Sequence, residues 1–157
     1  MLGSDFLIII GADHAGFELK NQVKFKLKEL NIDFLDVTDY EIDLNDDYVD
    51  VAESICKEVL KDSKNFGIAI CGTGIGISIA CNKIKGIIAG NCLNTEVAKL
   101  LKEHNNCNVI CFGGRLENNI DDIIYSIEEF TKAEFKDIRH KRRVDKIKKL
   151  EEKFGEN

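Results

Sequence analysis

The chain has 157 residues, a formal net charge of −6 at pH 7, 44% hydrophobic residues and 32% charged residues. This composition is typical of a single globular domain, and it excludes an intrinsically disordered chain. The acidic balance argues against general nucleic-acid binding. No apolar run reaches the roughly 20 residues of a membrane-spanning helix, and the first residues lack the pattern of a secretion signal, so we expect a cytoplasmic protein with no membrane partner.

From the N-terminus onward, short apolar runs alternate with amphipathic stretches. In chain order the pattern predicts a strand at residues 6–10, a helix at 19–30, a strand at 33–37, a helix at 48–59, a strand at 67–70, a short helix ending near 82, a strand at 86–89, a helix at 97–104, a strand at 108–112, and helices at 120–130 and 144–150. Five buried strands separated by helices indicate parallel βαβ units with right-handed crossovers. We therefore expect a three-layer αβα sandwich in one domain over residues 1–157, with a five-stranded parallel Rossmann-like sheet and a C-terminal helical extension at 137–153.

Charges and cysteines are unevenly distributed along the chain. Acidic residues crowd positions 36, 39, 41, 43, 46, 47 and 50, and basic residues crowd positions 139, 141, 142, 143, 146, 148 and 149. A local basic cluster on an acidic protein can hold a small anion without attracting nucleic acid broadly. The six cysteines form no Cys-x-x-Cys pair, so we expect no disulfide framework.

Polar and glycine-rich segments stand where ligands of open parallel sheets bind, beyond the carboxyl ends of the strands. Asp13 and His14 follow the first strand, and the glycine-rich segment Cys71–Gly76 follows the third. We also expect His104 and Asn105, at the end of the helix before the fifth strand, to reach this site. A satisfied polar residue at a strand end remains an alternative interpretation of His14, and a helix C-cap remains one of His104.

The glycine-rich segment is the most informative motif. Gly72, Gly74 and Gly76 allow a backbone that approaches a ligand closely, and the helix that follows directs free N–H groups at the same place. Such a loop can hold a phosphate or an oxyanion that forms during a reaction. It completes neither G-x-G-x-x-G nor a Walker motif, so a simple tight strand-to-helix turn remains the alternative.

Cys71 stands immediately before this helix start, where the dipole favours a thiolate that could act as a base or a nucleophile. We expect its sulfur beside backbone amides and open to a cavity. A buried inert thiol is the alternative, and we keep it for the other cysteines. Arg139 and Arg143 are four residues apart on one predicted helix face and could grip one phosphate, although on these residues alone a solvated helix face is the favoured interpretation.

Four segments together resemble the type B ribose-5-phosphate isomerases and their relatives, the galactose-6-phosphate isomerase subunits. They are Gly11–Lys20, Ile70–Lys83, Glu103–Val109 and Arg139–Val144, in the order in which the family has them. The resemblance implies an aldose–ketose isomerase of the non-oxidative pentose phosphate pathway that needs no metal and no organic cofactor. It also implies a homodimer or homotetramer in which two chains share each active site and the C-terminal helix packs on a partner subunit.

The same resemblance implies roles for individual residues. Cys71 corresponds to the base that moves a proton between neighbouring sugar carbons, Thr73 to a group that helps protons pass between the two oxygens, and His104 to the residue that assists ring opening. The implied substrate-binding positions are Asp13, His14, Gly72, Gly74, Ile75, Gly76, Asn105, Arg139 and Arg143.

Three other functions remain open on the sequence. A hexose 6-phosphate, such as galactose or allose 6-phosphate, can replace ribose 5-phosphate as the substrate. A non-catalytic sugar-phosphate-binding module would keep the glycine loop and the arginines but tolerate loss of Cys71. A cysteine hydrolase would use Cys71 as nucleophile and His104 as base, but the sequence offers no evident carboxylate to orient His104.

Overall fold

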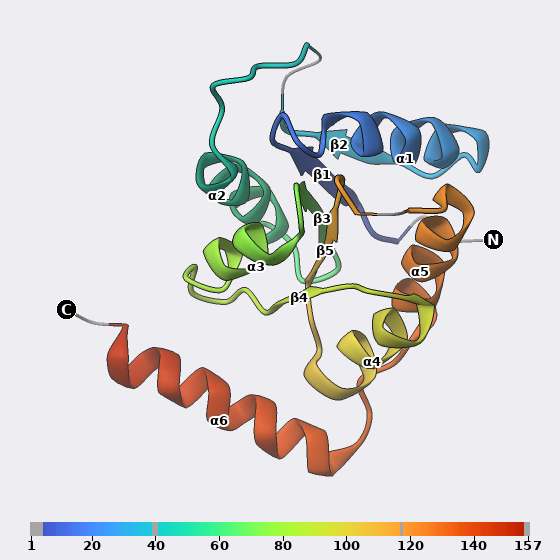
Figure 1. Cartoon of the computed structure of the whole chain (residues 1–157). Coiled ribbons are helices and arrows are strands. Elements are labelled where there is room, and N and C mark those ends of the chain that lie inside the picture. The colour runs from blue at the N-terminus through green and yellow to red at the C-terminus, as the bar shows by residue number, and fades with distance from the viewer. Residues whose placement is uncertain (1–4, 39–40, 117, 156–157) are drawn as a thin grey trace.

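A five-stranded parallel sheet forms the centre of the structure, a computed structural model of the chain (Figure 1). The structure describes residues 5–38, 41–116 and 118–155, so Asp39 of the acidic stretch lies outside the described residues. The strands are β1 (Ile8–Ala12), β2 (Phe34–Asp36), β3 (Phe66–Cys71), β4 (Ala89–Asn91) and β5 (Val109–Gly113), in the sheet order β2-β1-β3-β5-β4. The helices are α1 (Phe17–Glu29), α2 (Tyr48–Val59), α3 (Ile75–Cys81), α4 (Thr95–Asn105), α5 (Ile120–Lys132) and α6 (Ile138–Phe154).

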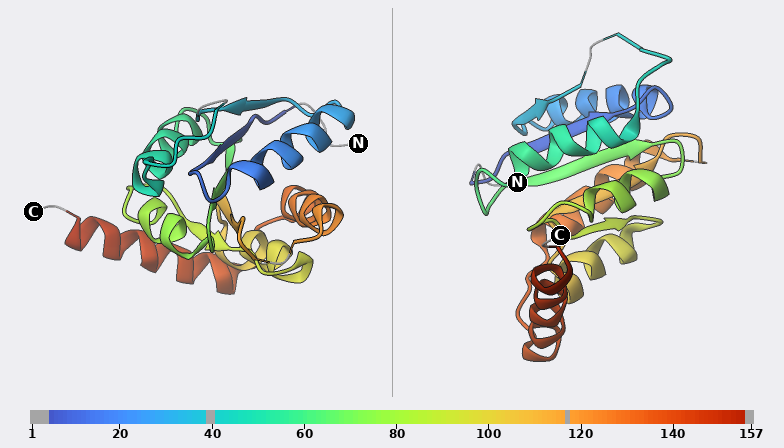
Figure 2. Two further views of the ribbon diagram at one scale, coloured as in Figure 1. Left: turned by 45° about the horizontal axis from the view of Figure 1, so that its top comes forward. Right: turned by 90° about the vertical axis from the view of Figure 1, so that its left-hand side faces the viewer.

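Helices cover both faces of this sheet, which confirms the predicted αβα sandwich (Figure 2). On one face, Ile8 and Ile10 pack with apolar residues of α1, α4 and α5. On the other face, Ile9 and Cys71 pack with apolar residues of α2 and α3. The alternation follows from the two-residue period of a strand, which sends neighbouring side chains to opposite faces. Cys71 therefore points to the side of α2 and α3.

The fourth strand lies later in the chain than the apolar pattern predicts. We expected it at residues 86–89, but β4 begins at Ala89, which is paired with Val109 of β5. The residues before it form a turn, in which Gly86 has a φ of +87° and its carbonyl accepts a hydrogen bond from Asn108 Nδ2 at 2.9 Å. Because this turn also carries isoleucines, its hydropathy resembles that of a strand.

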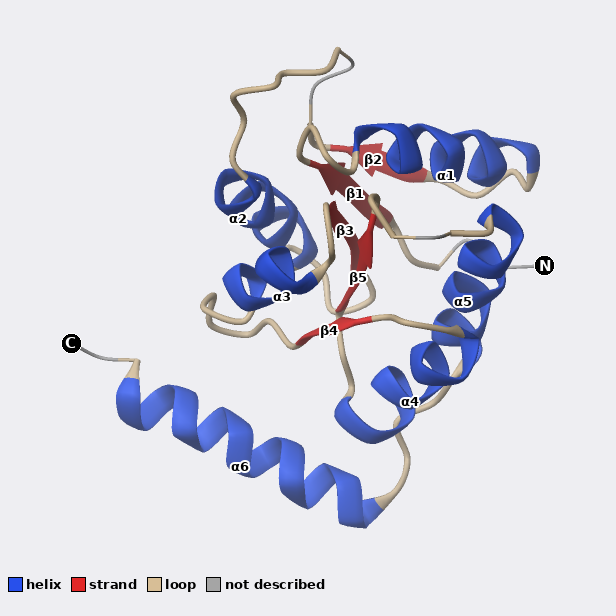
Figure 3. Cartoon of the chain, in the orientation of Figure 1, coloured by secondary structure: helices blue, strands red, loops and turns tan. Residues whose placement is uncertain are grey.

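The C-terminal helix α6 lies outside the sheet and its covering helices (Figure 3), and the Glu151 carboxylate near its end accepts the N–H of Gly86 in the turn before β4 at 3.2 Å. Its first turns are anchored by His140 and Val144, which are buried. Further along, Ile147, Leu150 and Phe154 expose 44%, 57% and 66% of their surface. The helix thus carries an apolar face that the described part of the same chain leaves open to solvent. None of the helices in the described residues has the length and apolar character required to cross a membrane.

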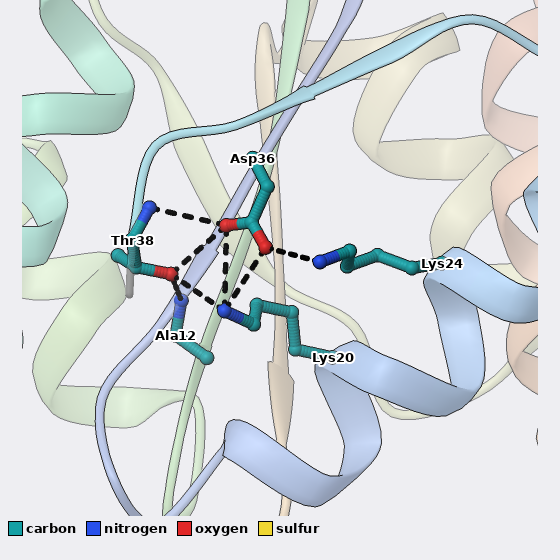
Figure 4. A network of polar contacts seen from close by, with 5 residues as sticks. All are labelled: Ala12, Lys20, Lys24, Asp36 and Thr38. Carbon is teal, nitrogen blue, oxygen red and sulfur yellow. Dashed lines mark hydrogen bonds and ion pairs between the residues drawn. The ribbon is translucent and has the colours of Figure 1, made fainter. Parts of the chain in front are cut away.

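A buried ion cluster joins α1 to the end of β2 (Figure 4). Asp36 Oδ2 lies 2.6 Å from Lys24 Nζ and 3.1 Å from Lys20 Nζ, and the Asp36 and Lys20 side chains expose 2% and 0%. Burial by itself raises the pKa of Asp36, but hydrogen bonds from Lys24, the Thr38 backbone and Lys20 outweigh it and leave the pKa below its ordinary value. Thr38 Oγ1 also accepts the backbone N–H of Ala12 at 3.3 Å, so the cluster fixes the end of β1.

Candidate active site

The strand order reverses between β1 and β3, and this is where the polar segments gather. From β1 the chain continues to β2 at one outer edge of the sheet, whereas from β3 it continues to β4 at the opposite outer edge. Ligands of such sheets bind in the crevice at this reversal. The two loops at this point are in contact, because the Asp13 N–H donates to the Ile70 carbonyl at 3.2 Å. A β-carbon on Gly16 would lie 2.6 Å from Ile70, so the loop after β1 lies directly on β3.

The glycine-rich loop takes the conformation that its glycines permit. Gly74 has a φ of +79°, a left-handed conformation in which a side chain is strained. In this conformation the Gly74 N–H donates to Cys71 Sγ at 3.2 Å, and the Ile75 N–H donates to Thr73 Oγ1 at 3.2 Å. A β-carbon on Gly113 would lie 2.6 Å from the Thr73 carbonyl carbon, so the loop also lies against the end of β5. The sulfur of Cys71 therefore lies beside a backbone amide, as the sequence predicted.

Access to that sulfur differs from the expectation. Cys71 exposes only 4% of its surface and belongs to the apolar cluster under α2 and α3, so a single chain does not present it in an open cavity. The reason is local: Cys71 is still part of β3, and its side chain takes the inward direction that the strand dictates at this position. The loop residues Gly72 and Thr73, which follow it, are more exposed.

Asp13 and His14 lie beside this loop, and each is held by hydrogen bonds. The buried Asp13 carboxylate accepts the N–H groups of Ala15 and Gly16 at 3.0 and 3.1 Å, while its burial raises its pKa above the ordinary value. His14 Nδ1 lies 2.7 Å from Asp46 Oδ1. Ligand atoms of Asp13, His14 and Asp46 all lie within 4.8 Å of one another, so this group, alone among the described residues, could hold a metal ion. Their hydrogen bonds to each other and to the backbone account for the arrangement without an ion.

Arg115 is a candidate site residue that the sequence analysis missed. Its backbone N–H donates to the Gly72 carbonyl at 2.9 Å, and a β-carbon on Gly72 would lie 3.4 Å from Arg115 Cδ and 3.6 Å from Nη1. The guanidinium is thus placed over the glycine-rich loop. A signal was present, because Gly113-Gly114-Arg115 follows the fifth strand, where the same strand-end rule applies.

His104 and Asn105 lie beyond the opposite ends of the parallel strands from Cys71, which corrects the expectation that they stand with the segments at the carboxyl ends of the strands. A helix between parallel strands runs back against them, so α4 ends where β5 begins (Figure 1). Here the Gly67 N–H, near the start of β3, donates to the Asn108 carbonyl at 2.8 Å. Cys71 is four positions after Gly67, which is about 13 Å at the rise of a strand.

A second group of polar residues forms at the amino ends of the strands. The rings of His104 and His140 stack with centroids 4.0 Å apart, and Arg139 Nη2 lies 3.2 Å from His140 Nε2. The pKa of His140 lies below its ordinary value, because burial disfavours the charged ring and His104 and Arg139 add positive charge nearby. Arg143, one turn further along α6, is exposed. The structure therefore divides the predicted site into a Cys71 group at the carboxyl ends of the strands and a His104 group at their amino ends.

The fold and the first group define a doubly wound α/β protein with a cysteine and a glycine-rich amide loop in its switch-point crevice. The Ribose/Galactose Isomerase family model matches residues 8–147, and the chain belongs to this family. It is 39% identical to a probable ribose-5-phosphate isomerase B of Mycoplasma genitalium over 93% of this chain and 96% of that protein. It is 38% identical to the galactose-6-phosphate isomerase subunit LacA of Streptococcus mutans over 91% of this chain and 98% of that protein. The crystal structure of ribose-5-phosphate isomerase B from Mycoplasma genitalium with bound ribulose-5-phosphate superposes with a TM-score of 0.88 and 38% identity, covering 96% of this chain and 99% of that one.

Proposed function

We propose that this protein is an aldose–ketose isomerase that interconverts ribose 5-phosphate and ribulose 5-phosphate through an enediolate. Family membership supports an isomerase, and the ribulose-5-phosphate complex of the Mycoplasma genitalium enzyme supports a pentose phosphate as substrate. The observation that carries the proposal is the 3.2 Å hydrogen bond from the Gly74 amide to Cys71 Sγ at the switch point. The proposal places the reaction in the non-oxidative pentose phosphate pathway and in the cytoplasm.

The proposed chemistry is a proton transfer between neighbouring carbons. The Cys71 thiolate removes the proton from the carbon beside the carbonyl, the carbonyl becomes the enediolate oxygen, and the thiol returns the proton to the former carbonyl carbon. Amides of the Gly72–Gly76 loop stabilise the enediolate, which is where negative charge develops. The Thr73 hydroxyl carries the second proton between the two oxygens.

The remaining site residues bind and open the sugar. In this proposal Asp13 and Asn105 hold sugar hydroxyls, His104 assists ring opening, and the phosphate is bound by His14, Arg139 and Arg143. Arg115 joins them, because its side chain lies over Gly72. Binding energy from the phosphate orients the reacting carbons at the sulfur.

We propose that two copies of the chain form each active site in a homodimer, which can associate further into a homotetramer. One chain holds Cys71 and His104 at opposite ends of its parallel strands, so a second copy is needed to bring a His104 group to a Cys71 group. A largely apolar groove of about 520 Å³ lies between α2 and α3, and Ile79, which lines it, exposes 57% of its surface. In this proposal the groove of one chain receives the apolar face of α6 of the second copy. This separation also argues against a Cys71–His104 hydrolase within one chain.

Mixed dimers test the shared site. Cys71→Ala protein alone is expected to be inactive, and Arg143→Ala protein alone is expected to be nearly inactive at substrate concentrations far below its raised KM. A mixed dimer restores one site, because it combines Cys71 of one chain with Arg143 of the other. In an equal mixture of exchanging dimers we expect activity to recover to about one quarter of the wild-type value. No recovery in mixed dimers verified by mass spectrometry would contradict sharing.

Substrate preference separates the leading proposal from the hexose alternative, which the 38% identity to a galactose-6-phosphate isomerase subunit keeps open. We expect kcat/KM for ribose 5-phosphate to exceed that for galactose 6-phosphate and allose 6-phosphate by about 10–200-fold, because a pocket closed at five carbons must expand for a sixth. A coupled assay of the purified chain with each sugar phosphate measures the ratio. A higher value for either hexose phosphate would transfer the assignment to that substrate.

A further inference from the structure

We propose that Asp46 is a positioning residue that aims the imidazole of His14 at the substrate phosphate. The inference rests on the proposed function, because it assigns a phosphate to His14. It concerns a contact across 32 positions of the sequence, between the acidic stretch and the loop after β1.

One carboxylate oxygen holds both the backbone and the ring of His14. Asp46 Oδ1 lies 2.9 Å from the His14 backbone nitrogen and 2.7 Å from Nδ1. The two side chains expose 29% for His14 and 25% for Asp46, so the pair is partly shielded from solvent while still open to a ligand. With a single acceptor binding two groups of the same residue, the position and the rotation of the ring are both fixed.

The elements around Asp46 explain why it can do this. Asp47 is the N-cap of α2, with its side chain accepting the Val49 N–H at 2.9 Å, so the residue before it leaves the helix in a fixed direction. The Asp46 N–H also donates to the Asp43 carbonyl at 3.3 Å. Packing of α2 on the sheet thereby holds Asp46 in place, and it does so independently of any substrate.

The contact determines which nitrogen of His14 meets the ligand. The Asp46 carboxylate accepts the Nδ1 proton, so Nε2, on the other side of the ring, is directed away from Asp46. A phosphate oxygen can only accept, so the ring binds the phosphate in its doubly protonated form, in which Nε2–H donates to the phosphate while Nδ1–H donates to Asp46. The negative charge of Asp46 therefore lies behind the ring instead of facing the phosphate. A ring fixed in this way loses less side-chain entropy when it binds, and this is the gain that a positioning residue provides.

Four variants test the inference with ribose 5-phosphate as substrate and inorganic phosphate as competitive inhibitor. Asp46→Ala is expected to raise KM and the phosphate inhibition constant by about 10–100-fold, the equivalent of one lost charged hydrogen bond, with kcat changed less than about threefold. Asp46→Asn keeps an acceptor oxygen at the same place and should recover most of the loss. Asp50→Asn removes one charge from the same acidic stretch without a contact to His14, and it should behave as wild type.

The fourth variant, His14→Ala, shows whether Asp46 acts through His14. Adding Asp46→Ala to His14→Ala should have no further effect on KM, because the residue being positioned is already gone. Additive effects would overturn the inference, and so would a fall of kcat at unchanged KM. The proposed function has its own separate result: if Cys71→Ala kept full turnover, the isomerase chemistry would fail, whereas loss of turnover in Cys71→Ala with wild-type KM in Asp46→Ala would overturn the positioning role alone.

Discussion

Replacement of Cys71 by alanine is expected to lower kcat for ribose 5-phosphate by about 10²–10⁴-fold, the usual contribution of a positioned general base. KM should change little, because the proposed site binds the phosphate and hydroxyl groups of the sugar through other residues. Cys71→Ser keeps the size of the side chain but substitutes a hydroxyl that stays protonated near neutral pH, so it should be nearly as inactive. Initial rates and single-turnover kinetics of ribulose 5-phosphate formation measure both variants.

The control is Cys107→Ala, which removes a thiol of similar burial. Cys107 lies just before β5, at the amino ends of the strands and away from Cys71. It should keep kcat within a few-fold of wild type, even if it costs some stability. Solvent deuterium exchange adds a second readout, because the base exchanges the substrate proton with solvent and Cys71→Ala should abolish this exchange together with turnover. Isomerisation at an undiminished rate in Cys71→Ala would show that another group removes the proton.

Replacement of Asp36 by alanine is expected to lower the free energy of unfolding by about 3–5 kcal/mol, the usual cost of removing one member of a buried ion pair. Asp36 provides a buried counter-charge to Lys20 and Lys24 and accepts the Thr38 hydroxyl at 3.0 Å (Figure 4). Urea unfolding at one fixed protein concentration measures the effect. Glu58→Ala is the matched control, because it removes an ion pair to a Lys61 side chain that is 65% exposed and should cost less than about 1 kcal/mol.

The pH dependence of the same variant follows from the pKa of Asp36, which lies below its ordinary value of 3.8. Because the folded state holds the charged carboxylate more strongly than the unfolded state does, this stabilisation is complete above the unfolded pKa. It is lost as the pH falls through the lower, folded pKa. The difference in stability between wild type and Asp36→Ala should therefore be constant near neutral pH and shrink in acid below about pH 4. A difference that stays constant to pH 3 would show that the charge of Asp36 does not stabilise the fold.

The sequence predicted the elements best where burial and periodicity agree. The strands around Ile9 and Ile68 are apolar on both faces, and only a central parallel strand explains that pattern. The prediction was less accurate at residues 86–89, where a turn and a strand carry the same kind of side chain. Hydropathy reports burial, and it does not distinguish the two ways in which a buried backbone forms hydrogen bonds.

The candidate site was predicted in part for a related reason. Cys71, the glycine-rich loop and Asp13 follow directly from the ends of two strands, so local position in the sequence locates them. The prediction for His104 was wrong in its placement, because a helix between parallel strands runs antiparallel to them and α4 therefore ends beside the start of β5. Arg115 was missed although it follows a strand end. The functional roles of these residues remain predictions until the variants are measured.

The sequence by itself determined the fold class, the order of the motifs and the cysteine beside a glycine-rich helix start, because these depend on residues that are neighbours in the chain. Tertiary structure alone decided that Asp46 holds His14, that Lys20 and Lys24 share Asp36, and that Cys71 is nearly covered. Such contacts join residues brought together by the packing of helices on the sheet, and nothing in the local pattern specifies which distant side chain arrives. The same packing places the Cys71 group and the His104 group at opposite ends of the parallel strands in one chain, and the proposal of a site shared by two copies rests on this separation.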